Sequence, residues 1–429
     1  MSTTCVIGAG SSGIVACKVL HERGLPFDCY EISSGIGGNW RYENDNEMSS
    51  AYQSLHINTS RTRMAYSDFP MPDAYPDFPH HSQIARYFED YVDHFGFRDQ
   101  IQFRAKVAHV EPAEEGGYDV TIEHLDSGTT ETKRYDAVLV ANGHHWDPNW
   151  PEFPGTFGGE VLHSHDYKVP GPYAGKRVVI VGVGNSGTDI ASELSRNAER
   201  VMLSSRSGAH IVPKYILGRP LDHWNTEQIS RLPFPMQRLL FSALLRLSRG
   251  KQESYGFPTP SHPFGSEHPT VSNELLNLIG HGRIIPKPNI ARLDADRVVF
   301  TDGTEEEADV LIYATGYKVS FPFFDAHFLS AENNELPLYG RVVDPERPSL
   351  YFIGLIQPLG AIMPLAEVQS EWVADLLEGK ATLPRPAAMR QAIARDEAKM
   401  TKRYVKSKRH TMQVDFFDYA RQVERLRKR

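Results

Sequence analysis

Two glycine clusters have the spacing that brings a backbone turn against a phosphate group. They are Gly8-Ala9-Gly10-Ser11-Ser12-Gly13, after the apolar residues Thr4–Ile7, and Gly182-Val183-Gly184-Asn185-Ser186-Gly187, after Arg177–Val181. Glycines let such a turn approach a pyrophosphate, and the helix that follows offers free N–H groups and the positive end of its dipole. One cluster alone is weak evidence, because ordinary tight turns share the pattern. Two copies, each between a strand and a helical pattern, predict two dinucleotide-binding sites.

The residues that end the next strand distinguish the two sites. Glu31 ends the strand 27–30, 18 residues after Gly13. A carboxylate there accepts hydrogen bonds from ribose hydroxyls and repels a 2′-phosphate, which predicts FAD or NAD. The second strand, 201–203, ends in Ser204-Ser205-Arg206, and a guanidinium with two hydroxyls suits the 2′-phosphate of NADP. The alternatives are a solvated glutamate after a tight turn and an ordinary surface arginine.

Each glycine cluster opens a segment that closes with the same pattern. An Asp, a short apolar strand and a glycine occupy 136–143 and again 309–316, so 135 positions separate Gly8 from Gly143 and 134 separate Gly182 from Gly316. This predicts an α/β fold with two Rossmann-like dinucleotide-binding domains, the second inserted into the first. We expect the first part of the first domain at 1–155 and the second domain at 156–320, with an insertion at about 215–285. Residues 321–429 should complete the first domain and add C-terminal helices.

Composition limits the function classes. A net charge of −8 argues against a general nucleic-acid binder. Cys5, Cys17 and Cys29 form no CxxC pair and are expected to be buried thiols in a reducing cytosol. The close histidine pairs have no carboxylate or cysteine partners at useful spacing, so no metal site is expected. We find no signal peptide and no apolar run of membrane-spanning length, which predicts a soluble, cytoplasmic protein.

The remaining chain contains segments that we expect to shape the site. The loop 52–78 is long and rich in aromatic residues, which is typical of a segment that lines a site. A helix is predicted over 82–95, with strands at 101–110 and 118–123. Residues 236–249 predict a basic amphipathic helix, whose apolar stripe would lie on a membrane or, as we favour, pack on the domain or a partner subunit. A hairpin at 294–302, a strand at 350–353, a helix over 367–377 and two further helices complete the prediction.

One resident dinucleotide and one visiting NADP are typical of a flavoprotein reductase, in which hydride passes from NADPH to the flavin. A disulfide reductase would need a cysteine pair beside the flavin, and a metal oxygenase would need a ligand set. Because the sequence shows neither, the reduced flavin is expected to react directly with dioxygen or an organic acceptor.

Further motifs, in order along almost the whole chain, resemble the flavin-containing monooxygenases. The most specific is Phe157-x-Gly159-x-x-x-His163-Ser164-His165-Asp166-Tyr167, directly before the second glycine cluster. The others are Gly37-Gly38-Asn39-Trp40, Asn58-Thr59-Ser60-Arg61, Ser67-Asp68-Phe69-Pro70, Ala314-Thr315-Gly316-Tyr317, the residues 354–360, and Arg409-His410-Thr411-x-Gln413-x-Asp415. Related Baeyer–Villiger enzymes usually carry Trp where Tyr167 stands, which favours the N- and S-oxygenating branch. The chain ends at Arg429 without the hydrophobic anchor of the membrane-bound members, which argues against stable membrane insertion.

The resemblance implies an NADPH-dependent monooxygenase in which FAD and O2 form a C4a-hydroperoxyflavin that oxygenates an amine nitrogen or a sulfide sulfur. It implies Asn58 as the catalytic residue beside the flavin and NADP, although a turn residue is the alternative. It also implies that Gln357 faces the flavin from a helix start and that His163 and Tyr167 hold the interdomain linker. The family leans towards homodimers, which leaves the oligomeric state open. The expected FAD-side residues are Gly8, Ala9, Gly10, Ser11, Ser12, Gly13, Glu31, Gly38, Asn39, Trp40, His56, Ile57, Asn58, Thr59 and Gln357. The expected NADP-side residues are Gly182, Gly184, Asn185, Ser186, Gly187, Ser205, Arg206 and Thr315.

Three other functions stay open at this point. A Baeyer–Villiger ketone monooxygenase and an uncoupled NADPH oxidase would use the same two nucleotides. A redox sensor would bind them without turnover. The sequence does not identify the physiological substrate or the preference between nitrogen and sulfur.

Overall fold

The computed structural model describes residues 3–260, 262–403 and 412–428. Within this part of the chain, two compact units are distinguished. The first comprises Met1–Ala51, Leu55–Asp147 and Lys318–Arg429, and the second comprises Tyr52–Ser54 and Pro148–Tyr317. The chain therefore leaves the first unit to build the second and then returns to the first. This agrees with the predicted insertion of the second domain into the first.

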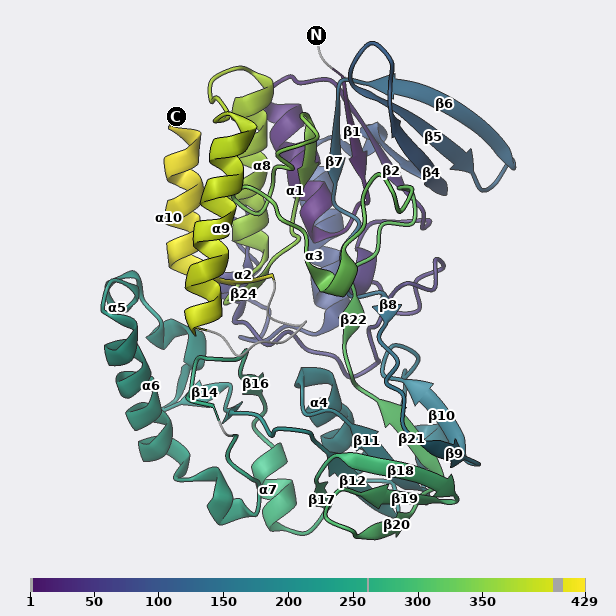
Figure 1. Cartoon of the computed structure of the whole chain (residues 1–429), viewed down its shortest axis with the longest axis vertical. Coiled ribbons are helices and arrows are strands. Elements are labelled where there is room, and N and C mark those ends of the chain that lie inside the picture. Colours follow the sequence, from purple (N-terminus) through teal and green to yellow (C-terminus); the bar gives the residue numbers. More distant parts are fainter. Residues whose placement is uncertain (1–2, 261, 404–411, 429) are drawn as a thin grey trace. The chain divides into compact units, whose positions relative to one another are not determined.

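The first unit is built on a parallel five-stranded sheet in the order β23-β7-β1-β2-β3 (Figure 1). Its strands are β1 (Thr4–Ile7), β2 (Phe27–Glu31), β3 (Ile101–Phe103), β7 (Ala137–Val140) and β23 (Leu350–Phe352). β1 and β7 are buried along their whole length, which is typical of parallel strands covered on both faces. The returning strand β23 pairs with β7, so the C-terminal part of the chain completes this sheet.

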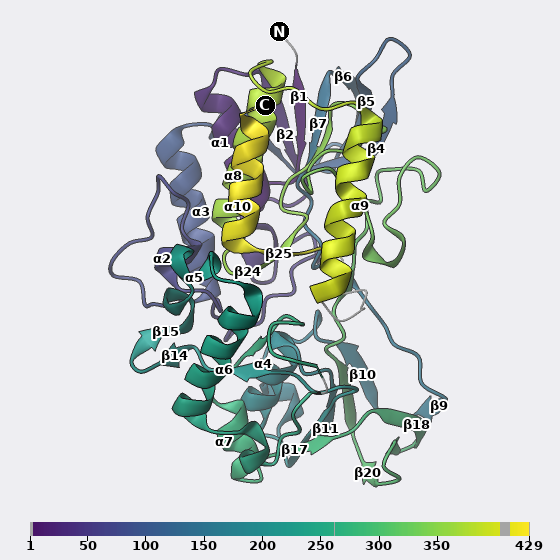
Figure 2. The same cartoon turned by 60° about the vertical axis from the view of Figure 1, so that its left-hand side comes forward.

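The helices of the first unit contribute apolar residues to one core on one face of this sheet. They are α1 (Ser11–Glu22), α2 (Arg61–Met64), α3 (His81–Phe95), α8 (Met363–Leu377), α9 (Pro386–Arg403) and α10 (Phe416–Arg427). Helix α8 packs against both α1 and α10 (Figure 1 and Figure 2). A core that includes Val6, Leu20, Phe88 and Trp372 lies on this face. All three cysteines are free and buried, as predicted.

The opposite face of the first sheet is covered by an antiparallel sheet. Its strands are β4 (Ala105–Pro112), β5 (Tyr118–His124) and β6 (Thr129–Tyr135). Two details of the sequence prediction were wrong here. The strand expected over 101–110 is divided into β3 and β4 by Arg104, which has a positive φ of 54°. Strand β6 was not predicted, because its exposed Thr, Glu and Lys residues give it no apolar pattern.

The second unit repeats the plan of the first around the parallel sheet β10-β21-β11-β12-β17. These strands are β10 (Glu160–His163), β11 (Arg177–Val181), β12 (Arg200–Ser204), β17 (Ile284–Lys287) and β21 (Val310–Tyr313). In the first sheet, β1 precedes the glycine cluster and lies between β2 and β7. In the second sheet, β11 precedes the glycine cluster and lies between β12 and β21 in the same way. This shared order confirms two Rossmann-like sheets.

Smaller elements complete the second unit. A mixed sheet contains β9 (Gly155–Phe157), β18 (Ile290–Ala295), β19 (Arg297–Phe300) and β20 (Glu305–Glu307). Two short pairs join β13 (Ile211–Val212) to β16 (Thr270–Val271) and β14 (Tyr215–Ile216) to β15 (Arg219–Pro220). The helices are α4 (Asn185–Leu194), α5 (Glu227–Ser230), α6 (Phe234–Arg249) and α7 (Leu275–Gly280). β18 and β19 form a hairpin over 290–300, whereas the sequence predicted one at 294–302.

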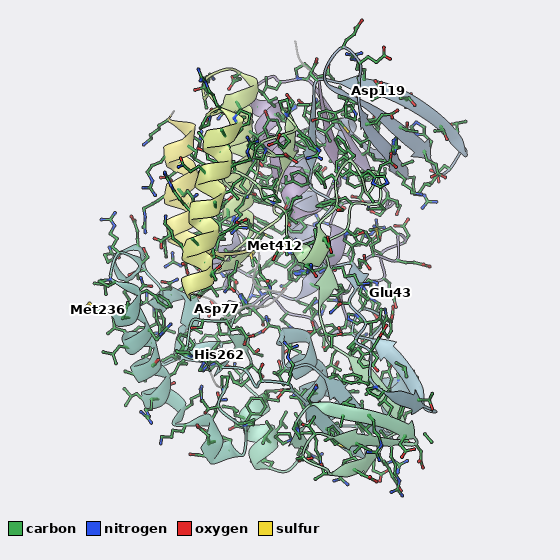
Figure 3. The ribbon with its side chains drawn as sticks, viewed as in Figure 1. Glu43, Asp77, Asp119, Met236, His262 and Met412 are labelled. Carbon is green, nitrogen blue, oxygen red and sulfur yellow. The ribbon has the colours of Figure 1, made fainter. Side chains whose placement is uncertain are left out.

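Helix α6 exists as predicted, but only part of its apolar surface packs on its own domain, through Leu244 and Leu245. Met236, Leu240 and Leu247 are 50%, 49% and 79% exposed, and the buried residue of the helix is Leu245. Figure 3 shows Met236 on the outward side of α6. Periodicity shows that a helix has an apolar face but not which way that face turns. In the part of the chain that the structure describes, no helix is long and apolar enough to cross a membrane.

Candidate functional site

A cavity of about 370 Å³ lies in the first unit at the carboxyl ends of its parallel strands. In open α/β sheets this edge is where ligands bind, because the loops leaving neighbouring strands diverge there. Many of the predicted FAD-side residues line the cavity. They are Gly8, Gly10, Ser11, Ser12, Glu31, Gly38, Asn39, Trp40 and Gln357. The glycine turn, the acidic strand end and the returning segment therefore meet around one space.

Glu31 is held in position by its own neighbours. Its side chain is buried, and its carboxylate accepts hydrogen bonds from the Ala9 N–H at 2.7 Å, the Ser33 N–H at 2.9 Å and the Ser33 hydroxyl at 2.7 Å. An ionised carboxylate has about four acceptor positions. It therefore retains capacity for a ribose hydroxyl, and the residues present fit an adenosine with a plain ribose. The role of Ala9 is to hold Glu31 through its backbone.

Gly13 serves helix packing and does not line the cavity. A Cβ atom at this position would lie 1.8 Å from the Gly8 carbonyl oxygen. Only glycine therefore lets α1 start so close to the end of β1.

We expect Gly13→Ala to lower the unfolding free energy of the first unit by about 3 kcal/mol, because the helix must shift to relieve the overlap. The matched control is Gly24→Ala. Gly24 has a φ of 62° but no heavy atom within 4 Å of a built Cβ, so only backbone strain of about 1 kcal/mol is added. Thermal unfolding followed by flavin fluorescence compares the two variants. Equal shifts in their midpoints would contradict the packing role.

Asn58 lies in a loop whose backbone is held on both sides, and after it the Arg61 N–H donates to the Asp77 carbonyl at 2.7 Å. The Ile57 N–H donates to the Pro79 carbonyl at 3.0 Å, and His56 forms a bridge with His80. The Asn58 Oδ1 atom is buried and has no hydrogen-bond partner among the described residues. Leaving such an oxygen unsatisfied costs about 1–3 kcal/mol, so a bound ligand is a natural partner for it. His56, Ile57, Asn58 and Thr59 do not line the cavity described above.

Gln357 does not stand at a helix start, contrary to the sequence prediction. It begins β24 (Gln357–Leu359), which pairs in parallel with β25 (Gln413–Asp415), and α8 begins only at Met363. The pairing joins segments more than 50 residues apart in the sequence, so no local pattern indicates it. The residues Arg409, His410 and Thr411 of the same motif lie outside the described residues.

In the second unit, a segment of the insertion supports the glycine turn. The Thr270 hydroxyl donates to the Val183 carbonyl at 2.6 Å, and the Val271 N–H donates to Asn185 Oδ1 at 2.9 Å. This bond orients the Asn185 side chain through its oxygen, and the two amide hydrogens are donors that suit phosphate oxygens. A Cβ on Gly187 would lie 2.0 Å from the Gly182 carbonyl oxygen, which repeats the packing seen at Gly13. Gly184 and Ser186, in the same turn, are partly buried.

The end of β12 presents a free cationic side chain. The Ser205 N–H donates to the Lys287 carbonyl at 3.0 Å, and Arg206 follows with its side chain exposed. Within the described part of the chain, no hydrogen bond or ion pair engages Arg206, so its guanidinium is available to an anion. The Thr315 hydroxyl donates to the Asn149 carbonyl at 2.6 Å and holds the loop after β21. The donors fit a nucleotide with a 2′-phosphate.

His163 and Tyr167 are both completely buried in the second unit. Burial and the neighbouring His165 lower the pKa of His163 to about 4, so its ring is neutral at pH 7. The Tyr167 hydroxyl donates to Glu193 Oε2 at 2.6 Å, which ties the segment after β10 to α4.

Sequence reasoning missed a polar group next to the second glycine turn. The Tyr52 hydroxyl donates to Asp189 Oδ2 at 2.8 Å. Burial is the main reason that the pKa of Asp189 rises to about 6, and it lowers the pKa of the nearby Lys214. Asp189 lies two positions after Gly187 in the sequence, but its partner Tyr52 is 137 positions away and no spacing links the two.

Comparisons with known proteins agree with this geometry. Residues 2–427 match the family model described as flavin-binding monooxygenase-like. The chain is 39% identical to flavin-containing monooxygenase 5 of Rattus norvegicus, over 98% of this chain and 82% of that protein. It is 36% identical to the N-oxide-forming dimethylaniline monooxygenase 2 of Rattus norvegicus, over 96% and 80% of the two chains. The solved structure of the S-allyl-L-cysteine S-oxygenase from Allium sativum has a TM-score of 0.75 and 26% identity, and the match covers 99% of this chain and 88% of that one.

Proposed function

Because this chain belongs to the flavin-binding monooxygenase-like family, we propose that it uses NADPH and O2 to oxygenate an amine nitrogen or a sulfide sulfur in small molecules. Two findings support this choice of substrate class. One relative is named for N-oxide formation and another for S-oxygenation. The observation that carries the proposal is the contrast between two equivalent strands. Strand β2 ends at the buried Glu31, whereas the exposed Arg206 follows the end of β12.

FAD is the resident cofactor, and when bound it supplies the centre that accepts hydride and reacts with O2. In the proposal, the N–H groups at the start of α1 bind its pyrophosphate and Glu31 accepts from its ribose hydroxyls. Gln357 lines the same cavity from the returning segment. Asn58 presents an amide whose buried oxygen lacks a partner among the described residues.

NADP is proposed to bind the second unit through the matching edge of its sheet. The N–H groups at the start of α4 and the amide hydrogens of Asn185 would bind the pyrophosphate, and the Val271 N–H holds the Asn185 side chain through its oxygen. Arg206 and Ser205 bind the 2′-phosphate. Thr315, after the last strand, borders the same edge of the sheet. Each of these groups orients the nucleotide and transfers no proton.

The chain itself contributes orientation and exclusion of water more than acid–base chemistry. His163 is neutral and buried, and the Tyr167 hydroxyl donates its hydrogen bond to Glu193. Both residues therefore stabilise the second unit, which supports the role of holding the segment before the glycine turn. Tyr167 at the position of a tryptophan in ketone-oxygenating relatives supports the amine and sulfide branch.

A substrate panel tests the proposal. Purified protein with FAD and NADPH is given trimethylamine, a thioether, an indole or a cyclic ketone, and oxygenated product and peroxide are measured per NADPH consumed. We expect N-oxide or sulfoxide as the main product. Lactone alone would indicate a ketone monooxygenase, peroxide alone an oxidase, and no NADPH oxidation a nucleotide-binding sensor. Failure of anaerobic NADPH to bleach the flavin would refute all flavin-dependent turnover.

The cellular compartment and the oligomeric state are part of the same proposal. Three buried free thiols support a reducing compartment such as the cytosol. A homodimer is proposed from the family resemblance, and light scattering of the purified protein tests it.

A further inference from the structure

One peptide group in each glycine turn is held by a residue from outside the turn. In the first unit, the Gly37 N–H donates to the Ala9 carbonyl at 3.2 Å. In the second unit, the Thr270 hydroxyl donates to the Val183 carbonyl at 2.6 Å. Ala9 and Val183 occupy the same place, between the first two glycines of their clusters. The equivalent carbonyl is therefore held in both units, once by a backbone group and once by a side chain.

A bond to this carbonyl sets the direction of the next N–H group. The peptide group is planar and trans, so the Val183 carbonyl and the Gly184 N–H point in opposite directions. Gly184 precedes α4 with φ −74° and ψ −179°, close to the −78° and −172° of Gly10 before α1. Among the described residues, no hydrogen bond engages the Gly184 N–H. A phosphate bound at the start of α4 is a natural acceptor for it.

Thr270 is itself fixed in place by the short strand pair β13 and β16, which lies within the second unit. Its side chain is buried, and its N–H donates to the His210 carbonyl at 3.0 Å. Two residues later, the Ser272 N–H donates to the Val212 carbonyl at 2.9 Å. Because the backbone is held on both sides of the hydroxyl, β16 presents a rigid donor to the turn.

We propose that Thr270 is a positioning residue for the nucleotide of the second unit: its hydroxyl orients the peptide between Val183 and Gly184 so that the Gly184 N–H is directed at the pyrophosphate. This proposal rests on the proposed binding of NADP to that unit. It makes the insertion a part of the nucleotide site. Since the pyrophosphate is common to NADP and NAD, Thr270 contributes to the binding of both, whereas Arg206 acts on the 2′-phosphate alone.

The variant Thr270→Val tests the role of the hydroxyl, because it keeps the shape of the side chain and removes the donor. Calorimetric titration of the purified holoenzyme should show that the Kd for NADP⁺ rises by about threefold to tenfold. The Kd for NAD⁺ should rise by the same factor, and the flavin content should be unchanged. Thr270→Ser keeps the hydroxyl and should bind NADP⁺ within about twofold of the wild type.

The matched control is Ser195→Ala. The buried Ser195 hydroxyl donates to the Ser192 carbonyl at 2.8 Å, just beyond the end of α4 that is far from the glycine turn. Its removal also takes one buried hydroxyl from a backbone carbonyl of the second unit, so it should lower the thermal unfolding midpoint about as much as Thr270→Val. It should leave both Kd values unchanged.

The proposal is overturned if Thr270→Val binds NADP⁺ as the wild type does, if Ser195→Ala weakens binding equally, or if Thr270→Ser is as weak as Thr270→Val. Should Thr270→Val lose its flavin or fold poorly, Thr270→Ser and Thr270→Ala make the same comparison, since they differ by one oxygen atom. A wild type that binds NADP⁺ while Thr270 proves neutral leaves the proposed function standing. A wild type that binds neither nucleotide refutes both proposals.

Discussion

Asn58→Ala is expected to lower the rate of oxygenated product on the order of 100-fold, the effect typical of removing one preorganised polar group from a reacting centre. FAD should stay bound, because the cavity-lining residues of the first unit are untouched. NADPH should still reduce the flavin. The physical reason is the buried Asn58 Oδ1, which has no partner in the described part of the chain and therefore offers its amide to a ligand. Most of the consumed NADPH should then appear as peroxide.

Three measurements separate this outcome from a general loss of structure. Flavin absorbance after gel filtration reports retention, anaerobic bleaching reports hydride transfer, and product per NADPH reports oxygenation. Asn277→Ala, which removes the same amide from an exposed position on α7, is the control and should match the wild type in all three. An unchanged product yield would make Asn58 an ordinary turn residue.

The parts of the fold that sequence predicts well are those whose cause is local. The unit from Thr4 to Glu31 was predicted closely, because a short apolar strand, a glycine turn and an acidic strand end follow one another without interruption. The repeat in the second unit was equally visible. Parallel strands such as β1 and β11 are buried on both faces, and the resulting continuous apolar runs are easy to recognise.

The parts that sequence could not predict depend on contacts between distant residues. The pairing of Gln357 with Gln413 places the returning segment at the cavity, yet neither residue lies in a pattern that indicates a strand. The support of Asn185 by Val271 comes from an insertion whose path no periodicity describes. Helix α6 shows a third limit, because a stripe of apolar residues predicts an interface but not its partner. Chemistry can therefore be assigned to strand ends from sequence, whereas the neighbours that orient each side chain require the structure.

Arg206→Ala is expected to raise the KM for NADPH by about 10-fold to 100-fold and to change the KM for NADH by less than about twofold. A bidentate arginine–phosphate contact is worth about 1.5–3 kcal/mol, which converts to this range of affinity. NADH lacks the 2′-phosphate and so loses nothing. The structure supports the choice of residue, because Arg206 is exposed at the end of β12 and, among the described residues, takes part in no ion pair that would compete with the phosphate.

Steady-state NADPH and NADH oxidation with the same substrate measures both constants. Arg206→Lys keeps the charge but not the paired geometry, so its KM for NADPH should lie between those of the wild type and the alanine variant. Arg196→Ala removes an exposed arginine, two residues after the end of α4, that is already paired with Glu274, and it controls for the loss of one positive charge from the same unit. Equal increases in the two KM values for Arg206→Ala would show that the guanidinium contacts a group common to both nucleotides, and the 2′-phosphate assignment would then be wrong.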